Sequence, residues 1–354
     1  MISILKKNIT SRDVAKAAGV SQSLVSMILT NASDKKIKPE TREHVIEVAR
    51  RLNYEVNINA RNMKSRRAGA IGLLSSWDEN SFVFPPVIKG VQTVCVENGL
   101  GVVICTGKAG AYGMKDYINY YLQNRIDGLI YISYVGVGNE GVIEELYKNG
   151  IPFVCIIGAR DLPGVSCVDV SFTESGSMAV KHLWEQGFRN IAYLQSGDYP
   201  DLNYAEKERI DGCKKAAEEY GMTFSLTDLF KDSVEDADRC RAAEELMKSG
   251  SCDCIISTSY ACFLMLKAAA RAGINVPGAI GVISLDNEVY APYLYPSLTT
   301  VDEPLVDIAE NAANIIIEKL KDGGACRKLE IAPSLTIRES TCRKACGGMR
   351  TSGQ

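Results

Sequence analysis

The strongest periodic pattern of apolar and polar residues lies in residues 10–31, where apolar side chains recur at three- and four-residue spacing in two short runs. In the first run, Val14, Ala15 and Ala18 share one face, which predicts an amphipathic helix. Gly19 separates the two runs and can adopt the left-handed backbone that a sharp turn requires. The segment therefore predicts two short helices that meet at a turn, a helix-turn-helix.

Capping residues predict where these helices begin. Thr10 and Asp13 have the spacing of a reciprocal capping box, so the first helix is expected to begin directly after Thr10. Ser21 is expected to cap the second helix. A third helix is expected to open at Pro39, a favoured residue in a first turn, and to end near Tyr54. The first part of the chain thus predicts a headpiece of three helices.

The second helix has a polar outer face. Its inward side is formed by Leu24, Val25 and Ile28. In a helix-turn-helix, the first residues of the second helix enter the major groove of DNA, where hydroxyl and amide groups match base edges. An ordinary helical hairpin is the alternative interpretation. The side chains predicted to contact DNA in the headpiece are Thr10, Ser21, Gln22, Ser23, Ser26 and Met27.

The distribution of charge favours the DNA-binding interpretation. Residues 1–67 contain 14 Lys and Arg against 6 Asp and Glu, a net charge of +8, whereas the rest of the chain carries −11. The whole-chain charge of −3 conceals this asymmetry. A basic module joined to an acidic body suits binding to phosphates with the body held away from them.

Residues 57–68 form a polar, basic stretch with one large apolar residue, Met63. The stretch is too short and too polar to hold a helix alone. We expect it to become ordered on double-stranded DNA against a copy from a second subunit, with Met63 inserted between base steps. A plain flexible linker is the alternative.

In the rest of the chain, short apolar runs alternate with amphipathic segments. This order predicts an α/β body with doubly wound parallel sheets and helices on both faces. At about 270 residues, the body is large for one sheet, so we expect two lobes with a ligand cleft between them. The predicted strands are 70–74, 101–105, 128–132, 152–157, 190–194, 254–257 and 280–285, and the clearest helical segments are 84–98, 114–124 and 260–272.

The headpiece resembles the lactose-repressor family of bacterial transcription regulators. The matching segments are residues 13–26, Thr41-Arg42, 52–54 and 60–64. The resemblance implies that Gln22, Ser23 and Met27 occupy base-contacting positions. It also places Met63 at a minor-groove wedge. The linker residues predicted to contact DNA are Asn57, Ala60, Met63 and Lys64.

The body resembles the same family, whose bodies are similar to periplasmic sugar-binding proteins. Matching segments include 124–130, 182–192, 282–287 and 296–301. Together with the matches in the headpiece, the resemblance extends over nearly the entire chain. The resemblance implies a headpiece over 1–56, a hinge or linker over 57–68 and an effector-binding and dimerisation domain over 69–342. The expected N-lobe is about 69–161 and 292–322, the expected C-lobe is about 162–291 and 323–342, and residues 343–354 are an expected disordered tail.

Two residues match the family's ligand positions. Arg209 has a planar fork that can bind vicinal hydroxyls or a carboxylate, and Asp286 can accept hydroxyl protons from a sugar ring. An exposed helix charge for Arg209 and a turn cap for Asp286 are the alternatives. Phe82 and Tyr204 are further aromatic candidates beside the predicted set. The effector-binding residues predicted are Arg209, Asp286, Phe84, Trp77, Tyr134 and Thr258.

Departures from the family pattern bear on specificity. Met27 and Thr30 replace the usual arginine and asparagine, Val56 stands where proline is common, and residues 34–38 are about two residues longer than usual. In the body, Thr258-Ser259 replaces Asn-Asp and 158–160 reads Gly-Ala-Arg. From these replacements we expect a pocket with fewer carboxylates, open to a modified or acidic sugar or to another ligand.

An enzyme is disfavoured. Gly136-x-Gly138-x-x-Gly141, with Asp161 twenty residues on, fits a dinucleotide-binding fingerprint, but it follows the third predicted strand of the body instead of the first. His44 and His182 are the only histidines, which is too few for a histidine-based triad or metal cluster. We therefore expect no catalysis, no cofactor and no metal.

Twelve cysteines lie mostly in apolar runs and lack zinc-site spacing, and no leader or membrane span is recognised, so free thiols in a reducing cytoplasm are expected. The tail lacks a leucine heptad, which favours a homodimer and a near-palindromic operator. We expect an effector, by resemblance a carbohydrate, to change the angle between lobes and thereby DNA affinity, with repression as the family default. A sugar-sensing module that has lost specific DNA reading is the alternative.

Overall fold

The computed structural model describes residues 9–29, 37–54, 67–75, 83–110, 113–133, 140–160, 162–195, 202–229 and 236–343. The chain divides into two compact units, Met1–Ala68 and Gly69–Gln354. This division falls at the boundary expected between the linker and the body. The linker itself, residues 55–66, lies outside the described residues.

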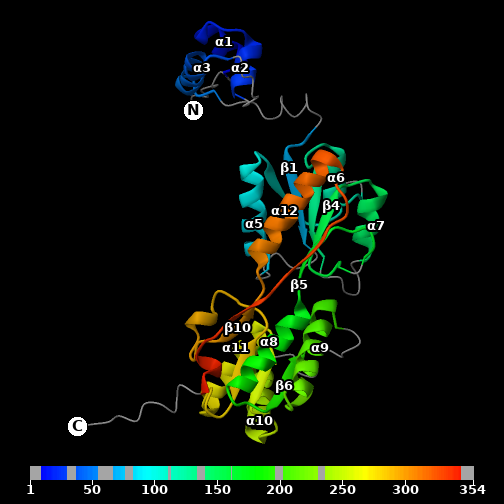
Figure 1. The fold of residues 1–354 in the computed structure, drawn as a ribbon, viewed down its shortest axis with the longest axis vertical. Coiled ribbons are helices and arrows are strands. Elements are labelled where there is room, and N and C mark those ends of the chain that lie inside the picture. The colour runs from blue at the N-terminus through cyan, green and yellow to red at the C-terminus, as the bar shows by residue number, and fades with distance from the viewer. Residues whose placement is uncertain are drawn as a thin grey trace, which may run out of the picture. The chain divides into compact units, whose positions relative to one another are not determined.

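Within its described residues, the first unit contains three helices, which form a headpiece (Figure 1). Gly19 ends the first helix in the left-handed conformation, with φ of 67°, as the sequence predicts. Apolar residues from all three helices form one small core that includes Val14, Val25, Ile28 and Val45. The helices are α1 (Ser11–Ala18), α2 (Gln22–Leu29) and α3 (Pro39–Arg51).

The second unit contains two six-stranded sheets, each the centre of one lobe. The first sheet has the order β11-β5-β4-β3-β1-β2, and all of its neighbours pair in parallel. Its strands are β1 (Ala70–Ser75), β2 (Gly101–Cys105), β3 (Gly128–Ile132), β4 (Phe153–Ile156), β5 (Cys167–Val170) and β11 (Lys328–Ile331).

Helices cover both faces of the first sheet. Successive strand residues point to opposite sides, and apolar residues on each side pack against a different pair of helices. Ile130 and Ile132 face α5 and α12, while Leu129 and Tyr131 face α6 and α7. Figure 1 shows α5 and α12 along the same face, where the two helices pack on each other. The helices are α5 (Phe84–Glu97), α6 (Asp116–Leu122), α7 (Glu140–Lys148) and α12 (Leu305–Asp322).

The second sheet has the order β12-β10-β9-β8-β6-β7, in which only the β10–β12 pair is antiparallel. The sheet is thus parallel, as the sequence predicts, except at the one edge where β12 runs antiparallel to β10. Its strands are β6 (Asn190–Gln195), β7 (Thr223–Asp228), β8 (Cys254–Ser257), β9 (Gly281–Ser284), β10 (Thr299–Asp302) and β12 (Ser334–Thr336).

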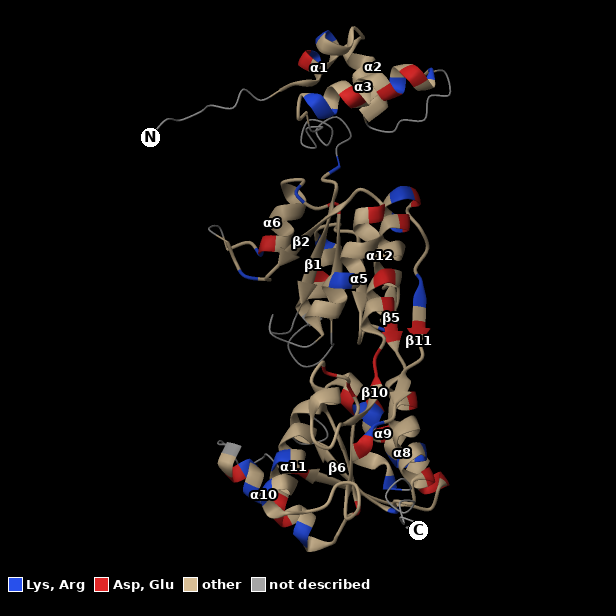
Figure 2. Ribbon diagram, turned by 90° about the vertical axis from the view of Figure 1, so that its left-hand side faces the viewer, with Lys and Arg blue, Asp and Glu red and all other residues tan. Residues whose placement is uncertain are grey.

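Helices also cover both faces of the second sheet. Tyr193 and Ile256 belong to a core with α8 and α9, whereas Leu194 and Ile255 belong to a core with α10 and α11. Charges of both signs are interspersed along α10 (Figure 2). The helices are α8 (Phe172–Glu185), α9 (Tyr204–Glu219), α10 (Asp236–Ser249) and α11 (Ser259–Ala272), and the short 3-10 segments are η2 (Ala291–Tyr293) and η3 (Glu339–Thr341).

The chain passes between the lobes three times, after β5, after β10 and after β11. These crossings differ from the lobe boundaries expected from the sequence. Residues 162–170 and 328–331 contribute strands to the first lobe, and residues 292–302 end in a strand of the second. The difference arises because hydrogen bonding to a distant neighbour, and not local composition, decides which sheet a strand joins.

Among the described residues, no helix is long and apolar enough to cross a membrane.

Candidate nucleic-acid interface and ligand site

The outer face of α2 has the polar character that the sequence predicts. Val25 and Ile28 are buried, Leu24 packs partly against the same core, and Met27 is half-buried. The exposed residues at this face are Ser21, Gln22, Ser23 and Ser26. The start of α2 therefore offers hydroxyl and amide groups to a partner of the headpiece.

Local hydrogen bonds orient several of these groups. Gln22 Nε2 donates to Ser11 Oγ over 2.8 Å, so this side chain reaches across to α1. Ser21 Oγ accepts the backbone N–H of Leu24 at 3.2 Å and lies 3.0 Å from Ser23 Oγ. Ser21 thus caps α2 as predicted.

Thr10 takes part in the predicted capping box at the start of α1. The backbone N–H and hydroxyl of Thr10 donate to Asp13 Oδ2 over 2.9 and 2.7 Å, and Asp13 N–H donates to Thr10 Oγ1 over 3.4 Å. The four predicted linker contacts lie outside the described residues. They are Asn57, Ala60, Met63 and Lys64.

The basic charge of the first unit is only partly carried by its described helices. Basic and acidic residues are mixed along α3 (Figure 2). Residues 9–29, 37–54 and 67 hold seven Lys and Arg against four Asp and Glu. More than half of the net charge of +8 over residues 1–67 therefore belongs to segments outside the described residues.

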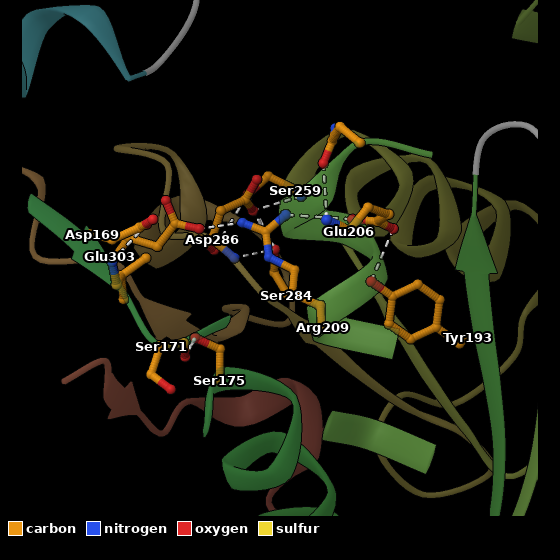
Figure 3. A network of polar contacts seen from close by, with 12 residues as sticks. Asp169, Ser171, Ser175, Tyr193, Glu206, Arg209, Ser259, Ser284, Asp286 and Glu303 are labelled. Atoms are coloured by element: carbon orange, nitrogen blue, oxygen red, sulfur yellow. Dashed lines mark hydrogen bonds and ion pairs between the residues drawn. The ribbon is translucent and has the colours of Figure 1, made fainter. Parts of the chain in front are cut away.

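Arg209 lies in α9 at the centre of a polar network between the lobes (Figure 3). Only 6% of the residue is exposed. Its guanidinium forms ion pairs with Glu303, in the segment that crosses from β10 to α12, and with Glu206 over 3.4 Å. It also lies 4.8 Å above the ring of Phe172. The alternative of an exposed helix charge is therefore wrong.

The start of α9 is held by local capping and by the second sheet. Asn203 Oδ1 accepts the backbone N–H of Glu206 over 2.9 Å. The hydroxyl of Tyr193 in β6 donates to Glu206 Oε1 over 2.9 Å (Figure 3). These contacts fix Glu206, which in turn supports Arg209.

Close helix packing also positions α9. A Cβ added at Gly212 of α9 would lie 2.1 Å from the carbonyl oxygen of Thr173 in α8, and one added at Gly176 of α8 would lie 2.3 Å from that of Arg209. Only glycine permits two helix backbones to approach this closely. The two glycines therefore bring the network-bearing turn of α9 against α8.

Asp286 follows β9 and is 97% buried. Its Oδ1 accepts the Ser259 backbone N–H over 2.7 Å, the Ser284 hydroxyl over 2.6 Å and the Ser259 hydroxyl. Asp286 thus caps the first turn of α11. The alternative considered from the sequence was a cap on the turn after its own strand, so the role is of the same kind but at another segment. Thr258 precedes this turn and is half-buried.

Arg160, after β4, connects the two lobes. Its guanidinium forms ion pairs with Glu208 of α9 and with Glu330 of β11, and it lies 5.5 Å above the ring of Tyr204. Burial raises the pKa of Glu208, an effect that Arg160 opposes. The contact joins a loop of the first lobe to a helix of the second.

Two further carboxyl groups lie buried beside this network. Asp169, at the end of β5, accepts the backbone N–H groups of Gly158 and Val170 over 3.0 and 2.9 Å. Burial nevertheless raises the pKa of Asp169 to about 6. Burial also raises the pKa of Glu303, and the neighbouring Asp286 and Asp169 add to that rise while Arg209 opposes it. The predicted scarcity of carboxylates is therefore wrong for this region.

The aromatic candidates have different fates. Phe84 is buried in the main core of the first lobe. Phe172 and Tyr204, at the starts of α8 and α9, pack edge to face with centroids 6.1 Å apart beside the two arginines. Trp77, Phe82 and Tyr134 lie outside the described residues. Tyr204 was among the sequence candidates, whereas Phe172 was not.

The site residues predicted from the sequence do not include Asp169, Glu206, Glu208 and Glu303. A usable signal existed for two of them, since Asp169 is the penultimate residue of β5 and Glu303 directly follows β10. The carboxyl ends of strands are where ligands bind in open α/β sheets. Glu206 and Glu208 carry no such signal, because they lie within a charged helix.

The remaining candidates are the glycine-rich motif and His182. Gly136, Gly138 and Asp161 of the glycine-rich motif lie outside the described residues, and Gly141 lies in α7. His182 is buried and hydrogen-bonded to Thr341 over 2.8 Å. An apolar groove of about 510 Å³ lies elsewhere, between α11 and the segment around Pro296.

Comparison with known families identifies two matching regions. Residues 10–57 match the model for bacterial regulatory proteins of the lacI family, and residues 180–341 match that for a periplasmic binding protein-like domain. The first region contains the helix-turn-helix, and the second contains most of the second lobe.

Similar curated proteins extend over nearly the whole chain. One is the HTH-type transcriptional repressor PurR of Photobacterium profundum, 27% identical over 338 residues, which are 94% of this chain and 98% of the relative. Another is the PurR repressor of Vibrio vulnificus, 29% identical over 340 residues, with the same coverage of 94% and 98%.

Solved structures share the fold. A lac repressor dimer bound to operator and the anti-inducer ONPF has a TM-score of 0.73 at 20% identity, covering 95% of this chain and 99% of that one. A complex of the transcriptional regulator CelR with cellobiose has a TM-score of 0.65 at 23% identity, covering 94% and 99%.

Proposed function

Because this chain belongs to the lacI family of bacterial regulatory proteins, we propose that it is a sequence-specific DNA-binding repressor of transcription whose affinity for its operator is controlled by a small molecule. The observation that carries the proposal is the helix-turn-helix, whose second helix α2 exposes polar residues at its start. We propose that Gln22 and Ser23 read base edges there, with Ser26 and Met27 beside them.

The small molecule binds between the two lobes of the body in this proposal. Three chain crossings and the Arg160–Glu208 ion pair connect the lobes, so a ligand among these groups acts on both at once. Arg209, Asp286 and Thr258 are the proposed contacts from the second lobe. A coupling free energy of about 1–3 kcal/mol changes operator affinity by about 5- to 150-fold.

We propose that the working form is a homodimer on a near-palindromic operator in the cytoplasm. Support comes from the lac repressor relative of known structure, which is a dimer bound to operator. Two headpieces related by a twofold axis require two half-sites of matching symmetry. The relatives named as repressors also support a regulator over an enzyme.

A gel-shift titration with the DNA upstream of the chain's own coding sequence tests the proposal. We expect specific binding by the wild type and loss of at least tenfold in affinity when Gln22→Ala and Ser23→Ala are combined. His44→Ala, at an exposed position of α3, is the matched control and should bind as the wild type does. Affinity should also fall steeply with salt, because binding releases counterions from phosphates.

Weak retention that is equal for upstream and unrelated DNA, and unchanged by Gln22→Ala with Ser23→Ala, contradicts the proposal. That result favours the alternative of a sensing module without specific DNA reading. A thermal-shift screen of sugars and sugar acids with Asp286→Ala tests the ligand site separately. Its interpretation needs Asp286→Asn as well, because Asp286 also caps α11.

A further inference from the structure

Carboxylates outnumber cationic groups in the network between the lobes. Arg160 and Arg209 are both already ion-paired, and Lys328 donates to the carbonyl oxygen of Arg160 at the exposed margin. Within the described part of the chain, the contacts of this network join three cations, Lys328 included, to six acidic side chains. We name these six the inter-lobe carboxylates: Asp169, Glu206, Glu208, Asp286, Glu303 and Glu330.

Two oxygens of this cluster, Glu208 Oε2 and Glu303 Oε2, are buried and have no hydrogen-bond partner among the described residues, and Glu303 is the more deeply buried of the two. The side chain of Glu303 is 2% exposed, and its Oε1 binds Arg209. Its Oε2 has no hydrogen-bond partner within the part of the chain that the structure describes. Its charged neighbours Asp169 and Asp286 are acidic and, when ionised, can only accept hydrogen bonds (Figure 3). The group that would satisfy Glu303 Oε2 must therefore be a donor.

The pKa shifts of the buried carboxyl groups agree with an excess of negative charge. Burial raises the pKa of Asp169 to about 6 and raises the pKa values of Glu303 and Glu208, although each has an arginine near it. A buried carboxylate resists ionisation when too few opposite charges surround it. A bound cation would reverse this effect and favour the ionised carboxylates.

We propose that the effector of this protein carries a protonated amine, which donates to Glu303 Oε2 among the inter-lobe carboxylates. The inference rests on the proposed function, since it assumes that the effector binds between the lobes. The shared chemistry is an ammonium group on a small molecule, and an amino sugar and an alkyl diamine are its two sources. A neutral sugar supplies weaker donors, and a sugar acid adds a like charge.

Two matched sets of compounds test the charge preference with the full-length protein at pH 7.5. The first set is glucosamine, glucose and glucuronate, and the second is putrescine, butane-1,4-diol and succinate. Thermal shift finds binding and calorimetry measures it. We expect the amine of at least one set to bind at least tenfold more tightly than its neutral and acidic counterparts.

Variants locate the preference at the cluster. Glu303→Gln should weaken binding of the amine at least tenfold, whereas Glu318→Gln, an exposed carboxylate of α12 paired with Arg327, should leave it unchanged. If Glu303→Gln fails to fold, the wild type still provides a test. Its amine affinity should rise from pH 5 to pH 7 as Asp169, with a pKa of about 6, ionises.

Tighter binding of the neutral or acidic member, no binding by either amine, or stabilisation by Ca²⁺ or Mg²⁺ in place of the amines would overturn the inference. Failure here is distinguishable from failure of the proposed function. Specific operator binding that a neutral sugar releases would refute the amine preference and leave the repressor standing. Loss of specific operator binding would contradict the repressor, whatever the ligand.

Discussion

The packing of α9 on α8 makes a strong prediction for Gly212→Ala. The new Cβ would lie 2.1 Å from the carbonyl oxygen of Thr173, so the helices must separate by about 1.3 Å to reach an ordinary contact of 3.4 Å. The obstacle is backbone, which cannot rotate away as a side chain can. Because α9 carries Glu208 and Arg209, the separation also displaces their ion pairs with the first lobe and the crossing segment.

The expected loss of stability is about 2 kcal/mol. Overpacking costs about 1–3 kcal/mol, and the better helix propensity of alanine returns up to about 1 kcal/mol. Displacement of the buried Arg209 pairs adds to the cost. For a unit of this size, each kcal/mol lowers Tm by about 2–4 °C, so we expect a decrease of about 4–8 °C.

Differential scanning calorimetry measures this effect, with Gly141→Ala as the matched control. Gly141 lies in α7 and is exposed, and a Cβ there meets no atom of the described residues within 4 Å. The control should gain about 0.5–1 kcal/mol, since alanine restricts the unfolded chain. A Tm for Gly212→Ala equal to that of Gly141→Ala would refute the close contact of α8 and α9.

Three other outcomes can be measured. In the folded protein the pKa of Asp169 is raised to about 6 from 3.8, so the folded state holds this proton more tightly than the unfolded chain does. The resulting contribution to the free energy of unfolding is fully present below pH 3.8, and about 3 kcal/mol of it is lost as the pH rises through 6. Denaturant titrations across pH 4–7.5 should show this decrease in the wild type and not in Asp169→Asn. Asp286→Asn should cost about 1–2 kcal/mol and speed hydrogen exchange at the first turn of α11, and unchanged exchange there would contradict the capping role. Iodoacetamide should label the exposed Cys326 rapidly in the native protein. The nine buried cysteines of the described residues should react only after denaturant is added, because burial protects their thiols from the reagent. Early labelling of Cys213 would contradict the packing.

Local pattern predicts the central strands well. The runs 128–132 and 254–257 form β3 and β8 with the expected bounds, because a strand covered on both faces is a continuous apolar run. The missed strands are polar or lie at edges. β5 contains Asp169, and β11 begins with exposed Lys328. Their extended conformation depends on pairing with distant segments, which no local window contains.

The site was predictable only in part for a similar reason. Arg209 and Asp286 were found through the family resemblance, and both lie buried in the polar region between the lobes. Their partners come from far along the chain: Glu303 is 94 residues from Arg209, and Glu330 is 170 residues from Arg160. The replacement at Thr258 suggested a pocket poor in carboxylates, but other elements supply them.

The placement of α9 gives a physical reason for communication between the lobes. Glu208 binds Arg160 of the first lobe, while Arg209, the next residue, binds Glu303 at a crossing between lobes. An amine that donates to Glu303 Oε2 places a second positive charge on the carboxylate whose Oε1 already holds Arg209, and so weakens that ion pair. One weakened, partly buried ion pair suffices for a coupling of about 1–3 kcal/mol. The same contacts that hold the lobes together can therefore transmit the binding of an effector, because Arg160 pairs with Glu208 of the opposite lobe and Arg209 pairs with Glu303 at a crossing between the lobes.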